Sequence, residues 1–146
     1  NMSWMFTMCR SLKELDLSEF NTSKVTNMNT MFGYCSSLIK LNINNFDTSN
    51  VSSMVAMFFD CSSLVELNEN NFNTLKVTSM NQMFQGCSSL RYLDLTNFDT
   101  SKVTTNGYRT MFNNLTNIIE IRVTRDTWTI PNSTIANSGV TDFTYV

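Results

Sequence analysis

A motif with a fixed period constrains this chain more than any other feature. The motif reads Met-Phe-x-x-Cys-x-Ser-Leu-x-x-Leu-x-Leu, and its copies begin 26 residues apart at Met5, Met31, Met57 and Met83. A fifth copy begins two residues late at Met111 and carries Leu115 in the cysteine position. Self-similarity at a period of about 20–50 residues is the signature of a solenoid, in which each repeat packs on its neighbours. We therefore expect a stack of repeats that share one continuous core.

Each copy combines two hydrophobic periodicities. Its first half has apolar residues at i, i+3, i+4 and i+7, which predicts one face of a short helix or 3₁₀ segment. In the second copy these are Met28, Met31, Phe32 and Cys35. Its second half alternates apolar and polar residues, which predicts a strand. The expected strands lie near 12–17, 38–43, 64–69, 90–95 and 118–123, parallel and about 4.8 Å apart.

A polar turn is expected between each strand and the next helical segment. It has the form Phe-Asn/Asp-Thr-Ser, beginning at Phe20, Phe46, Phe72 and Phe98, with leucine replacing serine in the third copy. Asn, Asp, Thr and Ser bond nearby backbone and favour tight turns, and the phenylalanine anchors the turn in the core. Thr26, Ser52 and Thr78 precede the helical segments and are expected to cap them.

The tail reads as a shortened repeat of the same solenoid. Val140, Phe143 and Tyr145 repeat the leucine spacing and predict a sixth strand at 140–145, with Asn137 in the cysteine position. The expected organisation is regular repeats over 1–126 and a divergent last repeat over 127–146. Because residue 1 already lies inside a repeat, we expect a longer parent protein.

Composition excludes several classes of partner. The net charge of the 146-residue chain is −2, with acids and bases interspersed. Nucleic acids and anionic membrane surfaces require a basic patch, so neither is an expected partner. Apolar runs stay well short of the roughly 20 residues that span a bilayer, so we expect no membrane insertion within this segment. The oligomeric state is left open.

Two stretches carry a family resemblance. Phe46-Asp47-Thr48-Ser49-Asn50-Val51 and the copy from Met83 to Leu95 resemble the BspA-like leucine-rich repeats of bacterial surface proteins, including those of mycoplasma lipoproteins and lactobacilli. The resemblance covers residues 1–112 closely and 113–146 more weakly. It implies a leucine-rich-repeat solenoid with a parallel sheet on one face. It also implies an extracellular location at a bacterial cell surface and a role in adhesion or protein binding, without naming a ligand.

The cysteines and methionines are predicted to lie in the core. Cys9, Cys35, Cys61 and Cys87 occupy one equivalent position. Adjacent rungs come within disulfide range, but leucine and asparagine also fill this position, so we favour a buried ladder of reduced thiols bonded to backbone. Nine of the ten methionines form two columns at helical spacing, which favours burial over a copper- or partner-binding face.

Catalysis and cofactor binding are not expected. The chain has no histidine, so Ser-His-Asp and Cys-His schemes are absent, and a linear cysteine stack cannot form a tetrahedral zinc site. Glu14 and Asp16 could suggest a carboxylate pair, but on a strand they belong to a repeated polar face. We expect neither an enzyme nor a bound metal or cofactor.

Glu69 breaks the repeat, because it stands where Leu17, Ile43 and Leu95 face inward. A buried unpaired carboxylate is costly. The favoured interpretation is a local bulge in which Asn70 and Asn71 let the strand turn outward. A ligand-binding role for Glu69 is the lesser alternative.

The exposed face of the sheet is the predicted binding surface, because rigid stacked strands present side chains with little entropy left to lose. A protein or glycan with hydrogen-bonding groups would suit it. Its three columns are Glu14, Lys40, Glu66, Tyr92 and Glu120; Asp16, Asn42, Asn68, Asp94 and Arg122; and Ser18, Asn44, Asn70, Thr96 and Thr124.

Two alternatives from other classes stay open. A structural spacer would need no ligand, and the near-identity of the repeats favours it. An ice- or mineral-binding array would use two threonine-rich columns, although turn and capping chemistry already explains these residues. The columns are Thr22, Thr48, Thr74 and Thr100, and Thr26, Ser52, Thr78 and Thr104.

Overall fold

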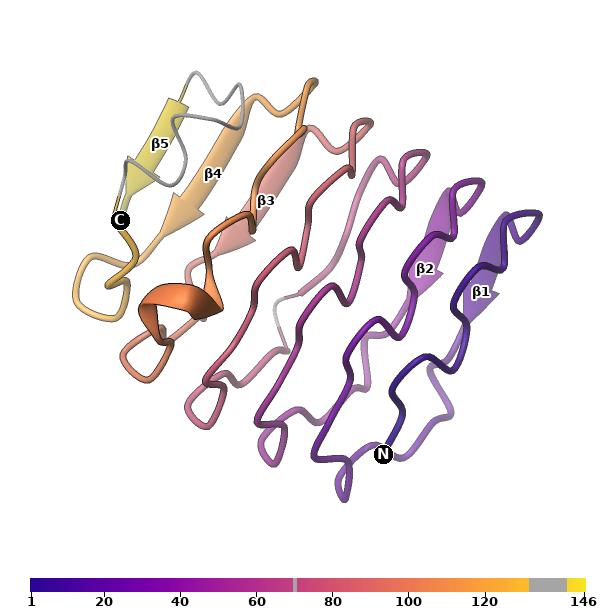
Figure 1. Ribbon diagram of the computed structural model, residues 1–146, viewed down its shortest axis with the longest axis horizontal. Coiled ribbons are helices and arrows are strands. Elements are labelled where there is room, and N and C mark those ends of the chain that lie inside the picture. The colour runs from indigo at the N-terminus through magenta and orange to yellow at the C-terminus, as the bar shows by residue number, and fades with distance from the viewer. Residues whose placement is uncertain (70, 132–141) are drawn as a thin grey trace.

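Successive 26-residue segments, here called rungs, lie side by side in sequence order (Figure 1). The computed structural model describes residues 1–69, 71–131 and 142–146. Main-chain hydrogen bonds join equivalent positions of neighbouring rungs. The N–H of Phe6 donates to the Met31 carbonyl at 2.9 Å, and that of Phe32 donates to Met57 at 2.9 Å. Each rung therefore rests on the next through its backbone as well as its side chains.

The strands run along one side of this stack (Figure 1). They form two parallel sheets, of order β1-β2 and β3-β4-β5. Their bounds are β1 Glu14–Asp16, β2 Lys40–Asn42, β3 Tyr92–Leu95, β4 Glu120–Val123 and β5 Asp142–Tyr145. Glu14 lies opposite Lys40, and Tyr92 lies opposite Glu120. The columns read from the repeat are thus physical neighbours; positions 140 and 141 of the expected sixth strand lie outside the described residues.

The expected strand at 64–69 is wrong. All six residues are described, and none belongs to a strand, so the sheet is interrupted between β2 and β3. The expectation that Glu69 turns outward is also wrong, since Glu69 is only 2% exposed. Its Oε1 accepts a hydrogen bond from the N–H of Asp94 at 2.9 Å. A carboxylate oxygen of this rung thus takes the place of the main-chain carbonyl that a paired strand would supply. Asn70, part of the expected bulge, lies outside the described residues.

Turns replace the short helices expected beside the methionine columns. In the second rung the N–H of Met31 donates to Met28 at 3.3 Å and that of Cys35 to Phe32 at 3.2 Å, both within the rung. Thr30 and Tyr34 adopt φ of 55° and 63°, the left-handed value that the third residue of a type II turn needs. The N–H groups of Phe32 and Tyr34 bond instead to the next rung, at the carbonyls of Met57 and Phe59. A helix would keep these donors inside one rung and leave the stack without its backbone ladder.

The residues expected to cap helices instead connect rungs. Ser52 Oγ donates to the Thr26 carbonyl at 3.1 Å, and Thr78 Oγ1 donates to the Ser52 carbonyl at 3.2 Å. Among the described residues the one helical segment is the 3₁₀ turn η1, Thr105–Gly107, in the rung that carries the two-residue insertion. The Gly107 carbonyl accepts from the N–H of Met80 at 2.6 Å and the Met111 carbonyl from that of Phe84 at 3.1 Å, so rung-to-rung bonds are present on both sides of the insertion.

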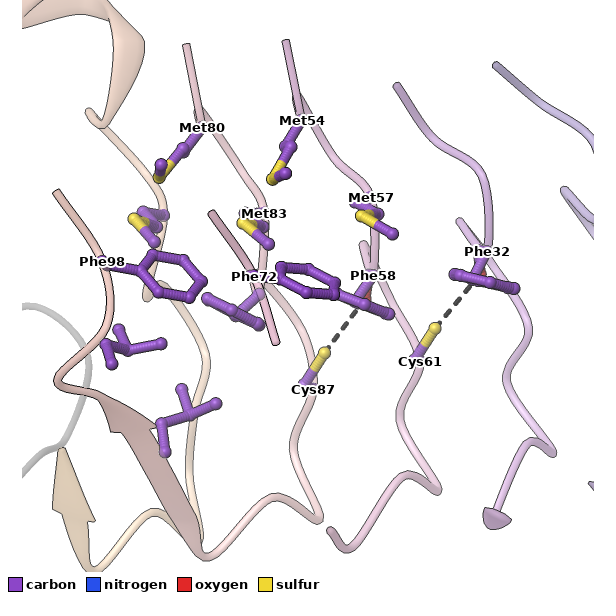
Figure 2. Close-up of a cluster of buried hydrophobic side chains, with 14 of the residues drawn as sticks. Phe32, Met54, Met57, Phe58, Cys61, Phe72, Met80, Met83, Cys87 and Phe98 are labelled. Atoms are coloured by element: carbon purple, nitrogen blue, oxygen red, sulfur yellow. Dashed lines mark hydrogen bonds between the residues drawn. The ribbon is translucent and has the colours of Figure 1, made fainter. Parts of the chain in front are cut away.

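A ladder of stacked phenylalanines forms the centre of the core. Successive ring centroids of Phe6, Phe32, Phe58, Phe84 and Phe112 are 5.7, 5.6, 5.8 and 6.2 Å apart, and Trp128 follows Phe112 at 6.2 Å. Methionines pack beside it, as Met57 and Met83 show in Figure 2. Both predicted methionine columns are fully buried from the second rung onward, whereas Met5 in the first rung is 46% exposed. Burying each such side chain contributes roughly 1.5–3 kcal/mol.

The cysteines form the predicted ladder of free thiols. None of the four is bridged, and Cys35, Cys61 and Cys87 are fully buried while Cys9 is partly exposed. Sγ of Cys61 donates to the Phe32 carbonyl at 3.1 Å, and that of Cys87 to Phe58 at 3.0 Å (Figure 2). Burial raises the pKa of Cys35 to about 11 and that of Cys87 to about 12. These thiols therefore stay protonated and pack as small apolar groups.

The predicted polar turns are confirmed, and their phenylalanine is buried in the core at Phe46, Phe72 and Phe98, but the same prediction is wrong for Phe20, which is 38% exposed. Asp47 accepts a hydrogen bond from the Ser49 N–H at 2.9 Å, and the Ser49 side chain is the main reason that the Asp47 pKa is lowered. Buried Thr22 joins adjacent turns, because its Oγ1 donates to the Asp47 carbonyl at 3.0 Å and accepts from the Asp47 N–H at 2.8 Å. Thr48 and Thr74 repeat the arrangement one and two rungs further on.

Candidate functional site

The predicted binding columns lie on the strand side, and strand pairing brings most of their members together. Asp16 lies opposite Asn42, and Asp94 lies opposite Arg122. Tyr92, at 55% exposure, is the large aromatic side chain of the face. Glu66 and Asn68 are exposed as expected, but they lie in the segment 64–69, which pairs with neither sheet.

Ion pairs hold several side chains of the face in place. Lys40 Nζ lies 3.3 Å from Glu14 Oε1. Arg122 contacts Asp94 Oδ2 through Nη1 at 3.4 Å and Glu120 Oε1 through Nε at 4.0 Å. Such exposed pairs add little to stability, but they limit the conformations of the long side chains. The face therefore offers partly ordered charges of both signs.

The interruption of the sheet coincides with a groove. It has a volume of about 490 Å³ and lies between β2 and the segment 65–68. Four predicted binding residues border it, namely Lys40, Asn42, Glu66 and Asn68. Leu41, Leu67, Ile39 and Val65 supply its apolar lining. A mainly apolar groove with a few convergent polar groups is the usual form of a ligand site.

A second groove lies one rung nearer the N-terminus. Its volume is about 440 Å³, and it is lined by Glu14, Leu15, Asp16, Lys40, Leu41 and Asn42. Asp16 accepts from the Ser18 N–H at 2.9 Å, and this bond is the main reason that the Asp16 pKa is lowered. Asp16 therefore remains a carboxylate in the acidic range in which most aspartates begin to protonate.

Sequence reasoning missed an apolar contribution to this face. Ile39, Val65 and Ile119 are 46%, 40% and 37% exposed, and the first two line the larger groove. They occupy the same position of their copies, directly before the first polar column. The sequence contained a signal for these residues. Three of the five copies have an aliphatic residue at this position, although a purely polar face would not require one.

Glu69 lies in the same rung as the larger groove but faces the core. Burial raises its pKa to about 8, and the Asp94 carboxylate contributes in the same direction. Its Oε2 is buried and has no hydrogen-bond partner among the described residues. Glu69 therefore shapes the interruption of the sheet and contributes no charge to its exposed face.

Comparison with known proteins places the chain in a family. A profile described as "Mycoplasma protein of unknown function, DUF285" matches residues 1–125, which is almost the span predicted for the regular repeats. Comparisons with curated proteins and with solved structures gave no match. Within the described ranges, no helix is long and apolar enough to cross a bilayer. The chain belongs to the family of mycoplasma proteins of unknown function defined by this profile.

Proposed function

We propose that the chain is a BspA-type leucine-rich-repeat solenoid and a non-enzymatic binding module of a bacterial cell surface. Its ligand is a protein or glycan that contacts the strand face. The observation that carries this proposal is the groove at the interrupted sheet, bordered by Lys40, Asn42, Glu66 and Asn68. These four residues, proposed as ligand contacts from the repeat alone, converge at one depression. The surface location and the adhesive role rest on the resemblance of the repeats.

The departure from repetition supports binding over a purely structural role. A spacer needs each rung to stack like the last, and the third rung departs from this over residues 64–69, which belong to no strand where the groove opens. The bonding of rung to rung elsewhere supplies the rigidity that a binding face needs. A spacer function stays the alternative, favoured by the regular phenylalanine ladder.

The geometry counts against an ice- or mineral-binding array. Thr22, Thr48, Thr74 and Thr100 are at most 1% exposed, and their hydroxyl groups are engaged in bonds to neighbouring turns. They cannot order water at a surface. Only the second column, Thr26, Ser52, Thr78 and Thr104, is exposed. One column of hydroxyls is too narrow for the flat, two-dimensional match that such binding requires.

The test uses an array of purified extracellular-matrix proteins and glycans. A ligand identified with the unmodified chain is then titrated against the double variant Lys40→Ala/Glu66→Ala. We expect at least a ~10-fold weaker affinity, a loss of about 1.4 kcal/mol. The matched control is Lys24→Ala/Glu19→Ala, which removes one exposed charge of each sign outside the groove. Equal binding by both variants, with unchanged melting temperatures, would refute the placement of the site.

A further inference from the structure

A second depression lies outside the strand face, in the turn-forming segments of the first four rungs. Its volume is about 250 Å³. Four of its lining residues form one column at 26-residue spacing, namely Trp4, Thr30, Ala56 and Gln82. The column runs large, small, small, large, so Trp4 and Gln82 close the ends of a trough whose floor is Thr30 and Ala56. With rungs about 4.8 Å apart, the ends are roughly 14 Å from each other.

Aromatic side chains gather around this trough. Tyr34 and Phe59 line it, with ring centroids 5.0 Å apart and planes at 65°. Trp4 is 59% exposed, as are its neighbours Met5 and Met8 in the first rung at 46% and 55%. Trp4, Tyr34 and Phe59 come from three different columns of the repeat. Other copies place Thr, Gly, Gln, Asp, Met or Asn where Phe59 and Tyr34 stand, so stacking of the rungs does not require an aromatic ring there.

Polar groups continue the trough beyond Tyr34. This residue also lines an adjoining depression of about 410 Å³. The other residues of that depression are Arg10, Ser36, Asp60 and Ser62. A guanidinium, a carboxylate and two hydroxyls thus lie on one side of the aromatic wall, and the Gln82 amide lies at the far end of the trough. The two depressions together offer flat aromatic surface with donors and acceptors at its margins.

The backbone around the trough is already hydrogen-bonded, which argues against an extended peptide as the occupant. The N–H of Thr30 donates to Val55 at 2.8 Å, and that of Ala56 donates to Asn81 at 2.8 Å. Strand addition depends on free main-chain groups, and here rung-to-rung bonds use them. Recognition must therefore come from side chains. A pyranose ring has one face of C–H groups that stacks on an aromatic ring, and hydroxyls at its rim that bond to amide, carboxylate and guanidinium groups.

We propose that this trough is a binding site for a short oligosaccharide. Trp4 and Tyr34 provide the stacking surfaces, and Gln82, Arg10 and Asp60 bond to the sugar hydroxyls. The site is separate from the groove on the strand face and does not depend on its proposed role. It gives the molecule two binding surfaces, of which this one is selective for sugar rings.

The test titrates the full chain with cellotetraose, chitotetraose, maltotetraose and mannotetraose, each followed by saturation-transfer NMR and by tryptophan fluorescence. Trp128 is 6% exposed, so a fluorescence change on adding sugar reports on Trp4. We expect at least one of the sugars to saturate with a Kd of about 1 mM or tighter. Saturation by none of them up to about 10 mM would overturn the proposal.

Variants then locate the sugar. Trp4→Ala and Gln82→Ala should each weaken binding at least ~5-fold, while Trp4→Phe retains it within about 2-fold because a ring remains. Leu75→Ala is the control, a large side chain that is 53% exposed and lines neither depression nor the strand-face grooves, and it should have no effect. Both Trp4 and Gln82 have solvent contact, so melting temperatures should change little. Binding that survives Trp4→Ala and Gln82→Ala, or that is lost in Leu75→Ala, would refute this site.

Discussion

Glu69→Gln should stabilise the protein by roughly 2–4 kcal/mol at pH 8 and destabilise it by about 1–3 kcal/mol at pH 4.5. Burial is the main cause that raises the Glu69 pKa from 4.5 to about 8. In the unfolded chain the carboxyl ionises near pH 4.5, whereas in the folded protein it keeps its proton to about pH 8. The folded state thus binds the proton more tightly. The stability that Glu69 contributes is complete below pH 4.5 and is lost as the pH rises towards 8.

The magnitude follows from the same two pKa values. Their difference is 3.5 units (8 − 4.5), and each unit corresponds to about 1.36 kcal/mol, so the loss between pH 4.5 and 8 approaches 5 kcal/mol. Glutamine cannot ionise, and its oxygen can still accept from the Asp94 N–H. Its NH₂ would be buried where Oε2 now lies, at a cost of about 1–3 kcal/mol. The expected net gain at pH 8 is therefore roughly 2–4 kcal/mol.

Guanidinium unfolding followed by circular dichroism at pH 4.5, 6 and 8 measures this effect. The wild-type free energy of unfolding should fall across the series, and Glu69→Gln should change from less stable than the wild type at pH 4.5 to more stable at pH 8. Glu66→Gln is the control, an exposed glutamate of the same segment, and should change stability by less than ~0.5 kcal/mol at each pH. A Glu69→Gln effect that is independent of pH, or destabilising at pH 8, would show that the carboxyl is already charged in the folded protein.

Two further predictions concern the thiols and the turn glycine. Reductant should leave the melting temperature unchanged, because the cysteines are free thiols. Thiol reagents should label Cys35, Cys61 and Cys87 only after denaturation, because these thiols are buried and their pKa values are raised. Cys61→Ala should destabilise the protein less than Leu64→Ala, whose larger cavity costs about 2–5 kcal/mol. A large fall in melting temperature with reductant would instead indicate bridged rungs. Gly86→Ala should cost about 1–3 kcal/mol, because φ is 79° and the new methyl would collide with the Asp60 carboxylate. Adding Asp60→Ala should restore part of the loss in thermal unfolding, and a neutral Gly86→Ala variant would contradict the predicted collision.

Local patterns in the sequence were sufficient for the features that repeat. The turn at Asp47 follows from side-chain chemistry within two residues, and strand columns such as Glu14 with Lys40 follow from the constant spacing. The cysteine ladder could be predicted for the same reason, because residues at one position of a regular stack share one environment. The apolar positions Ile39, Val65 and Ile119 were visible in the same alignment, but a binary reading of the strand as polar outside and apolar inside passed over them.

The period, the columns and the polar turns of this protein were determined by the sequence itself, since each depends on a short pattern repeated 26 residues later. Only the tertiary structure decided between helices and turns, because apolar spacing is the same for both and the choice depends on carbonyl acceptors in the next rung. It also decided that Glu69 is buried and that residues 64–69 leave the sheet, since the partner of that carboxylate, the Asp94 N–H, belongs to another rung. The trough of Trp4, Tyr34 and Phe59 likewise exists only after stacking, because it joins three columns that no local pattern connects.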